Sequence, residues 1–161
     1  MEVEMKIRGL MMDPVTNMPI VILRDASGDT VLPIWVGIFE ANAIALQVER
    51  IDTPRPMTHD LIKNILIQFD ARVEKIVVTE LRENTFYALI HLRYHDALLT
   101  IDSRPSDAIA LALRTDSPIF VTEDVINNSR SITLDKENLD PEDVKKWLEN
   151  LNPDELGKYK M

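Results

Sequence analysis

The sequence predicts an α+β fold, built as a single domain in which helices pack on a mostly antiparallel sheet. Three observations support this prediction: strand-like segments separated by turn residues, helical segments that follow them, and an internal repeat of that order. The chain has 161 residues, of which 45% are apolar and 28% are charged. This is an ordinary balance for one globular core.

The first half of the chain predicts three strands followed by two helices. Residues 25–29, Asp-Ala-Ser-Gly-Asp, predict a hairpin turn because such residues tolerate positive φ. After a stiff loop at residues 52–56, Thr58 is expected to cap the second helix. The predicted strands span residues 3–11, 18–24 and 30–36, and the predicted helices span residues 39–50 and 58–69.

The second half predicts the same order of elements. Pro105 is suited to the first turn of a helix, and Thr122 is expected to cap a short helix. The predicted elements are strands at residues 72–81, 85–94 and 97–102, a helix at 105–114, an extended segment at 118–121 and a short helix at 122–128.

Three short sequences of the first half recur in the second half at an offset of 64 or 65 residues. They are Asn42–Leu46 with Asp107–Leu111, Thr53–Pro54 with Ser117–Pro118, and Thr58–Ile62 with Thr122–Ile126. The repeat predicts a pseudo-symmetric domain at residues 1–130, in which a three-strand, two-helix unit is duplicated at about residues 3–70 and 71–130. Polar residues that break the symmetry are then the better candidates for a functional site.

Residues 131–161 predict an acidic tail with two short C-terminal helices. The helices are expected to begin near Asp140 and Asn152, each of which precedes a proline and two acids. Apolar side chains at helical spacing are expected to dock on the body of the protein or on a partner; they are Val144, Trp147, Leu148 and Leu151.

The composition excludes several classes of function. The absence of cysteine excludes disulfides, thiolate metal sites and a cysteine nucleophile. The N-terminus is not a signal peptide and no apolar run is long enough to span a membrane, so a cytoplasmic location is expected. The net charge of −9 argues against an open, electrostatically driven nucleic-acid surface. Nucleic acid remains a possible partner through a local basic patch or a bridging metal ion.

The densest polar cluster is Asp102-Ser103-Arg104-Pro105-Ser106-Asp107, where a strand ends and a helix begins. Arg104 is a candidate to hold a phosphate bidentately, beside helix N–H groups that favour anions. Asp102 and Asp107 are candidate oxygen ligands for Mg²⁺ or Mn²⁺. The alternative interpretation is structural: Asp102 or Ser103 caps the helix, and Asp107 interacts with the helix dipole.

A second cluster lies at residues 55–60, at the start of another predicted helix. His59 in the first helical turn is expected to favour the neutral imidazole, which can act as a general base or a metal ligand. Arg55 is a candidate to hold a phosphate. The alternative interpretation is that His59 is a packed or surface residue without a chemical role.

A third cluster lies at residues 33–41, where a strand gives way to a helix. Gly37 permits a close approach to the backbone. Glu40 is a candidate metal ligand, and the alternative is an acid that stabilises the first helical turn. Trp35 is expected in the core.

At these three clusters the sequence resembles the bifunctional nuclease (DNase/RNase) domain family. The segments that carry the resemblance are Pro33–Gly37 with Glu40–Ala41, Arg55–Leu61 and, above all, Asp102–Ala112. The resemblance runs from about Val3 to Asn128. It implies a small α+β fold built by duplication and nuclease activity on DNA and RNA, and it carries over no catalytic residue.

These observations lead to the hypothesis of metal-assisted hydrolysis of phosphodiester bonds in DNA or RNA. A divalent metal, Mg²⁺ or Mn²⁺, would stabilise charge on the phosphoryl group, while His59 activates water or protonates the leaving oxygen. The candidate catalytic residues are His59, Asp102, Arg104 and Arg55, and the candidate metal ligands are Glu40, Asp102 and Asp107.

Two other hypotheses remain open from the sequence. One is a non-catalytic binding or regulatory module, expected to be a homo-oligomer, in which Asp102 and Arg104 form a buried ion pair. The other is a small-ligand or regulatory anion site at the same helix N-terminus. The sequence does not distinguish them from a nuclease, because each uses the same polar residues.

Overall fold

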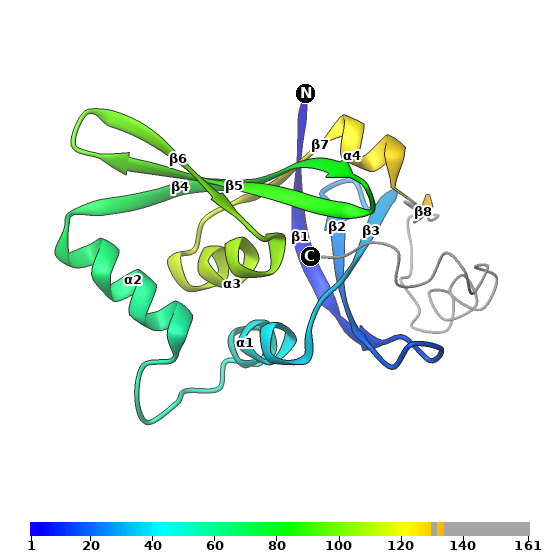
Figure 1. Cartoon of the computed structure of the whole chain (residues 1–161), viewed down its shortest axis with the longest axis horizontal. Helices are drawn as coiled ribbons and strands as arrows, with labels where there is room; N and C mark the ends of the chain where they lie inside the picture. Colours follow the sequence, from blue (N-terminus) through cyan, green and yellow to red (C-terminus); the bar gives the residue numbers. More distant parts are fainter. Residues whose placement is uncertain (130–131, 134–161) are drawn as a thin grey trace.

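The structure is a computed structural model, which describes residues 1–129 and 132–133. Its described part is an α+β domain with one eight-stranded sheet and four helices (Figure 1). In chain order the elements are β1 (Glu2–Met12), β2 (Pro19–Asp25), β3 (Thr30–Trp35), α1 (Ile38–Val48), α2 (Thr58–Gln68), β4 (Ala71–Arg82), β5 (Thr85–Tyr94), β6 (Ala97–Ser103), α3 (Pro105–Thr115), β7 (Ile119–Thr122), α4 (Glu123–Asn128) and β8 (Ile132–Thr133).

The sheet joins two antiparallel meanders through one central strand. Its strand order is β6-β5-β4-β7-β1-β2-β3-β8. Only the β4–β7 pair is parallel among the described strands, and the chain between these two strands includes α3, as parallel pairing requires a long connection. The predicted α+β class with a mostly antiparallel sheet is confirmed.

The two halves of the chain are similar in their meanders but differ beyond them. An 11-residue helix follows each meander, α1 after β3 and α3 after β6. The next helix has 11 residues in the first half, α2, and six in the second half, α4, where β7 also intervenes. Figure 1 shows α1, α2 and α3 grouped together and α4 apart from them beside β7. The internal duplication stays a prediction.

Local turn chemistry determines the β2–β3 connection, as predicted. Gly28 has φ +81°, a value that favours glycine. Its N–H donates to the carbonyl of Asp25 at 3.1 Å. The Asp25 carboxylate also accepts hydrogen bonds from the backbone N–H groups of Gly28 and Thr30, at 2.8 and 3.1 Å.

Two of the predicted helix caps are wrong, and one is confirmed. The Thr122 hydroxyl caps α4 by accepting from the N–H of Val125 at 3.4 Å. Thr58 is instead the first residue of α2. The Asp60 carboxylate reaches back over that turn and accepts from the N–H of Met57, which occupies the N-cap position, at 2.9 Å.

The cap predicted for α3 also differs in the structure. Arg104, not Asp102 or Ser103, occupies the N-cap position of α3, and it makes no side-chain cap hydrogen bond. The Ser103 hydroxyl donates to the carbonyl of Arg104 at 2.9 Å. The proline that follows Arg104 has no N–H to be capped, so this helix start needs fewer side-chain acceptors.

Helix α3 lies in the core of the domain. It packs against α1 and α2 and also against β4 and β5, so most of its surface is covered. Small side chains at three alternate positions allow this close packing; they are Ala108, Ala110 and Ala112, all fully buried. The predicted core position of Trp35 is confirmed. Because α3 is central, the residues of its first turn are placed near the starts of its neighbours.

Strand β8 was not predicted. It pairs with β3 through Val31 and Ile132 and through Thr30 and Thr133, so the sheet extends beyond the boundary expected at residue 130. A two-residue strand is too short to produce a sequence pattern. The predicted tail helices fall in residues 134–161, outside the described residues. In the described part, no helix has the length and apolarity needed to cross a membrane; the cytoplasmic location stays a prediction.

Candidate functional site

Four polar side chains from the starts of three helices form one hydrogen-bonded network. Asp107 of α3 contacts Nε2 of His59 in α2 through Oδ1 at 2.9 Å, and it accepts from Nε of Arg104 through Oδ2 at 2.9 Å. Arg104 also donates from Nη1 to Oε1 of Glu40 in α1 at 2.9 Å. We call Glu40, His59, Arg104 and Asp107 the polar network.

The helix packing places these groups together. Glu40 and Asp107 are acids in the first turns of α1 and α3, where the positive end of the helix dipole favours a carboxylate. His59 is in the first turn of α2 and is only 8% exposed. Since α1 and α2 both pack against α3, residues 48 and 64 positions apart in sequence meet at one end of the helical layer.

Hydrogen bonds control the ionisation of the network. Burial alone would raise the pKa of Asp107, but hydrogen bonds from Arg104 and His59 outweigh it and hold that pKa below its ordinary value. Asp107 and Glu40 in turn raise the pKa of Arg104. Asp107 is therefore ionised at neutral pH and can only accept, so the ring atom that faces it, Nε2 of His59, carries a proton and donates it.

A glycine makes room for the Glu40 carboxylate. Gly37 is the N-cap residue of α1, and a Cβ built on it would collide with the carboxylate of Glu40. The close approach predicted at this glycine is thus made by a side chain of the polar network.

The polar network borders a cavity of about 440 Å³ between α2, α3 and the strands β5 and β6. His59, Arg104 and Asp107 line its polar end, and Thr58, Asp102 and Ser103 also border it. The rest of the lining is apolar, from Ile62, Leu66, Ile90, Leu92, Ile101 and Leu111. Such a combination of an apolar wall and a few convergent polar groups is typical of a ligand site.

Asp102 borders this cavity but does not join the polar network. Its partner across the β5–β6 pair is Leu89, whereas the neighbouring partners Ile90 and Ile101 lie on the face of the sheet that borders the cavity. Because neighbouring residues of a strand point to opposite faces, the carboxylate of Asp102 is directed away from Asp107. The hypothesis of a buried Asp102–Arg104 ion pair is wrong, since Arg104 pairs with Asp107 and Glu40 with half of its side chain exposed.

Arg55 lies away from the polar network. It borders a different cavity, of about 340 Å³, together with Asp60 and Arg114. The two arginines predicted to hold one phosphate, Arg55 and Arg104, therefore line different cavities.

The predicted metal ligands do not converge in this arrangement. Glu40 and Asp107 lie on two sides of Arg104, and Asp102 is directed to the other face of the sheet. Across residues 1–129 and 132–133, no three His, Asp or Glu side chains are grouped so that they could hold a metal ion. The donor set as placed does not fit a metal centre, and metal dependence stays a prediction.

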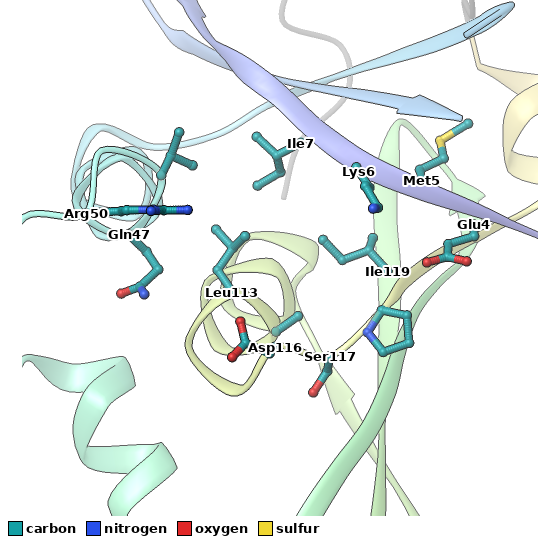
Figure 2. A pocket seen from close by; sticks show the side chains of 13 residues that line it. Glu4, Met5, Lys6, Ile7, Gln47, Arg50, Leu113, Asp116, Ser117 and Ile119 are labelled. Atoms are coloured by element: carbon teal, nitrogen blue, oxygen red, sulfur yellow. The ribbon is translucent and has the colours of Figure 1, made fainter. Parts of the chain in front are cut away.

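A further cavity of about 610 Å³ lies elsewhere in the fold, between β1, β7 and the C-terminal ends of α1 and α3 (Figure 2). Charged side chains of both signs line it, including Lys6, Arg50, Glu4 and Asp116. It contains none of the predicted site residues, so the polar network defines the candidate site.

One buried arginine behind the polar network was not predicted from the sequence. The side chain of Arg114 is 3% exposed and pairs with Asp60 of α2 at 2.8 Å. It also donates to the carbonyls of Ala110 in α3 and Ala43 in α1, each at 2.9 Å. One side chain therefore ties together the three helices that carry the network. Its position in a helix otherwise rich in alanine and leucine was the available signal.

A buried aspartate was also missed. Asp13 is fully buried, and it accepts from Nε1 of Trp35 and from the Thr16 hydroxyl, both at 2.8 Å, and from the N–H of Val15 at 2.9 Å. The Asp-Pro sequence at the β1–β2 turn was the signal, since aspartate commonly bonds the backbone of a turn that it starts. Its role is to hold that turn against β3.

The lowered pKa of Asp107 predicts a contribution to acid sensitivity. A carboxyl whose pKa is lower in the folded state stabilises the fold above its ordinary pKa of about 3.9, and this stabilisation disappears as the pH falls further. Asp107→Asn should therefore lose less free energy of unfolding than the wild type between about pH 5 and about pH 3. Urea denaturation at both pH values measures this, and equal losses in the two proteins would contradict the prediction.

Fold and site together define an α+β protein whose candidate site combines an imidazole, two carboxylates and a guanidinium at the junction of three helices. The chain belongs to the bifunctional nuclease domain family, whose model matches residues 21–133. The resemblance noted in the sequence is confirmed.

Similar proteins include bacterial and plant members. An uncharacterized protein of Mycobacterium tuberculosis is 34% identical over 162 residues, which cover 95% of this chain and 97% of the relative. Bifunctional nuclease 1 of Oryza sativa subsp. indica is 25% identical over 120 residues, 73% of this chain and 36% of that protein. Bifunctional nuclease 2 of Oryza sativa subsp. japonica is 27% identical over 107 residues, 64% of this chain and 33% of that protein. The match thus spans about a third of each rice protein.

Proposed function

We propose that this protein hydrolyses phosphodiester bonds in DNA or RNA, with the polar network as its site. One observation carries the proposal: the Asp107 carboxylate is hydrogen-bonded to both His59 and Arg104, and all three residues line the same cavity. This arrangement supplies a proton acceptor, a carboxylate that orients it and a cation suited to phosphate. Family membership and the names of the rice relatives support the same class of reaction.

His59 is suited to general base catalysis. Asp107 accepts the Nε2–H of the ring, so the lone pair lies on Nδ1, which has no hydrogen bond to any described residue. In this role Nδ1 takes a proton from the attacking water, and the Asp107 carboxylate stabilises the imidazolium that results. The leaving oxygen departs from the opposite side of the phosphorus and takes a proton from water, and the imidazolium then releases its own proton to solvent.

Arg104 is suited to hold the phosphate. Its Nε and Nη1 atoms are bonded to Asp107 and Glu40, which fixes the plane of the guanidinium. Its Nη2 atom makes no hydrogen bond to a described residue, and about half of the side chain is exposed. A planar cation fixed in this way can donate to a phosphate oxygen and stabilise the charge that develops on it.

Removing the guanidinium should weaken substrate binding. Arg104→Gln should raise KM by about 10–100-fold, because a hydrogen bond to a charged group contributes about 1.5–3 kcal/mol. Steady-state kinetics on a short fluorescent oligonucleotide measures this change. Arg93→Gln is the matched control: Arg93 also pairs with an acid, Glu74, and lies outside the polar network. If Arg104→Gln has the KM of the wild type, Arg104 does not hold the substrate.

Divalent-metal assistance is a separate proposal with its own test. The polar network contains two carboxylates and one guanidinium, so its charge opposes an anionic phosphate while His59 is neutral. The described residues do not form a metal centre by themselves, but a divalent cation held between the substrate phosphate and one or two carboxylates would reverse that balance. Cleavage is therefore expected to stop in EDTA and to return when Mg²⁺ or Mn²⁺ is added in excess. Full cleavage in EDTA would contradict metal assistance and leave the roles of His59 and Arg104 in place.

A non-catalytic, oligomeric binding or regulatory module is the second candidate function. The ion pairs of Arg104 favour it, because they also link the starts of α1 and α3 as a purely structural contact would. This function predicts that pure protein binds an oligonucleotide or another anion without cleaving it. Cleavage that co-purifies with the protein and responds to substitutions in the polar network would exclude it.

A further inference from the structure

An exposed apolar surface lies next to the site cavity, on α2 and β6. Its members are exposed by 36–65%; they are Leu61, Ile62, Ile65 and Phe69 from α2 and its C-cap, and Leu99 and Ile101 from β6. We call these six residues the α2–β6 surface, and we propose that a second copy of this chain binds there. This proposal concerns the assembly of two chains and does not depend on whether the protein hydrolyses phosphodiester bonds.

The arrangement of α2 explains why this side of the helix is uncovered. Successive residues of a helix are rotated by about 100°. His59 and Leu66 face the body of the protein, and Ile62 lines the site cavity on the β6 side. Ile65 follows on the same side and is half exposed. A helix that carries apolar residues well outside its buried face is expected to cover them with a partner.

Strand β6 presents an open edge beside that helix. Among the described strands it is the end strand of the sheet and pairs with β5 alone, in an unbroken register over its seven residues. Edge strands are usually protected by proline, by a bulge or by charged side chains. The β6 sequence, Ala-Leu-Leu-Thr-Ile-Asp-Ser, has one charge near its end and neither proline nor bulge. Its free backbone groups are therefore available to another strand.

The size of the surface matches a dimer interface. Aromatic side chains present roughly 150–250 Å² and leucine and isoleucine somewhat less, so six such side chains that are about half exposed present on the order of 450 Å². This lies within the range of the largest apolar patch on a typical monomer, about 300–600 Å², which is often functional. With the polar edge of β6 added, it approaches the roughly 800 Å² per partner of a stable interface.

A two-fold axis through the middle of β6 would bring both β6 and α2 into contact with their copies in the second chain. If two copies of β6 pair antiparallel about Thr100, Leu99 of one copy lies opposite Ile101 of the other, on the face that carries α2. The two α2 helices then approach each other along that face. A self-complementary strand of this kind favours a second copy over an unrelated partner.

The first test measures the mass of the full chain in solution by light scattering. The wild type is expected to be a dimer, and Ile65→Asp is expected to be a monomer. Ile67→Asp is the matched control, because Ile67 is also about half exposed on α2 but faces another direction, and this variant should stay dimeric. A monomeric wild type would overturn the proposal, as would a dimer that survives Ile65→Asp or dissociates equally with Ile67→Asp.

The second test does not depend on a destabilising substitution. The chain has no cysteine, so Thr100→Cys introduces one thiol per copy, next to its symmetry mate on the proposed axis. Mild oxidation should convert most of this variant into a disulfide-linked dimer at low protein concentration. Ala26→Cys, in the exposed β2–β3 turn, is the control and should stay largely unlinked. Linking that is no greater for Thr100→Cys than for the control would overturn the pairing of β6.

Discussion

Replacing His59 with glutamine should slow phosphodiester cleavage by about 10²–10⁴-fold, the usual contribution of a positioned general acid or base. The glutamine amide can still donate to Asp107 from about the position of Nε2, so the network keeps its hydrogen bond. It has no titratable lone pair to accept the proton of the attacking water. The loss should therefore fall on kcat, while KM changes little because Arg104 still holds the phosphate.

The control for this prediction is His95→Gln. His95 lies in the turn between β5 and β6 and does not contact the polar network, so the same substitution there should leave cleavage unchanged. A thermal melt of both variants checks that the buried position of His59 tolerates glutamine. Wild-type kcat in a folded His59→Gln variant would remove His59 from the reaction and end the proposed mechanism.

Replacing Arg114 with methionine should lower the free energy of unfolding by about 3–5 kcal/mol, as expected when one partner of a buried ion pair is removed. The methionine fills most of the volume but cannot donate to Asp60 or to the carbonyls of Ala43 and Ala110. Asp60 is partly exposed, so water can solvate it in part, whereas the Ala110 contact is buried. For a protein of this size, Tm should fall by about 10 °C.

Arg93→Met provides the comparison for this stability effect. Arg93 pairs with Glu74 at 2.8 Å, the same distance as the Arg114 pair, but its side chain is 39% exposed. Exposed ion pairs contribute little to stability, so this variant should melt close to the wild type. If the two variants are destabilised equally, burial does not explain the importance of Arg114.

The sequence alone predicted the class of the fold and the order of its elements. Strand alternation, helical spacing and turn residues such as those at 25–29 act over a few neighbouring positions, so they can be recognised without knowing the tertiary structure. The Thr122 cap was predicted for the same reason. The Thr58 cap was wrong because Asp60, two positions away, takes the N–H of Met57 instead, and local rules do not decide such a competition.

For the candidate site, the sequence identified the residues but not their partners. Glu40, His59, Arg104 and Asp107 were all selected as symmetry-breaking or helix-start residues, and the fold brings them together. The β5–β6 register directs Asp102 away from them, although its spacing to Asp107 looked favourable. Strand register depends on which side chains the sheet buries, so it was not visible in a single segment.

What the amino-acid sequence determined by itself is therefore the set of elements, their turns and the family to which the chain belongs. Only the tertiary structure decided that α3 lies between α1 and α2 and that Arg114 is buried at their junction. The physical reason is the sequence separation over which the interactions act. Backbone preferences act between near neighbours, whereas ion pairing and burial depend on which distant segments come into contact when the core forms.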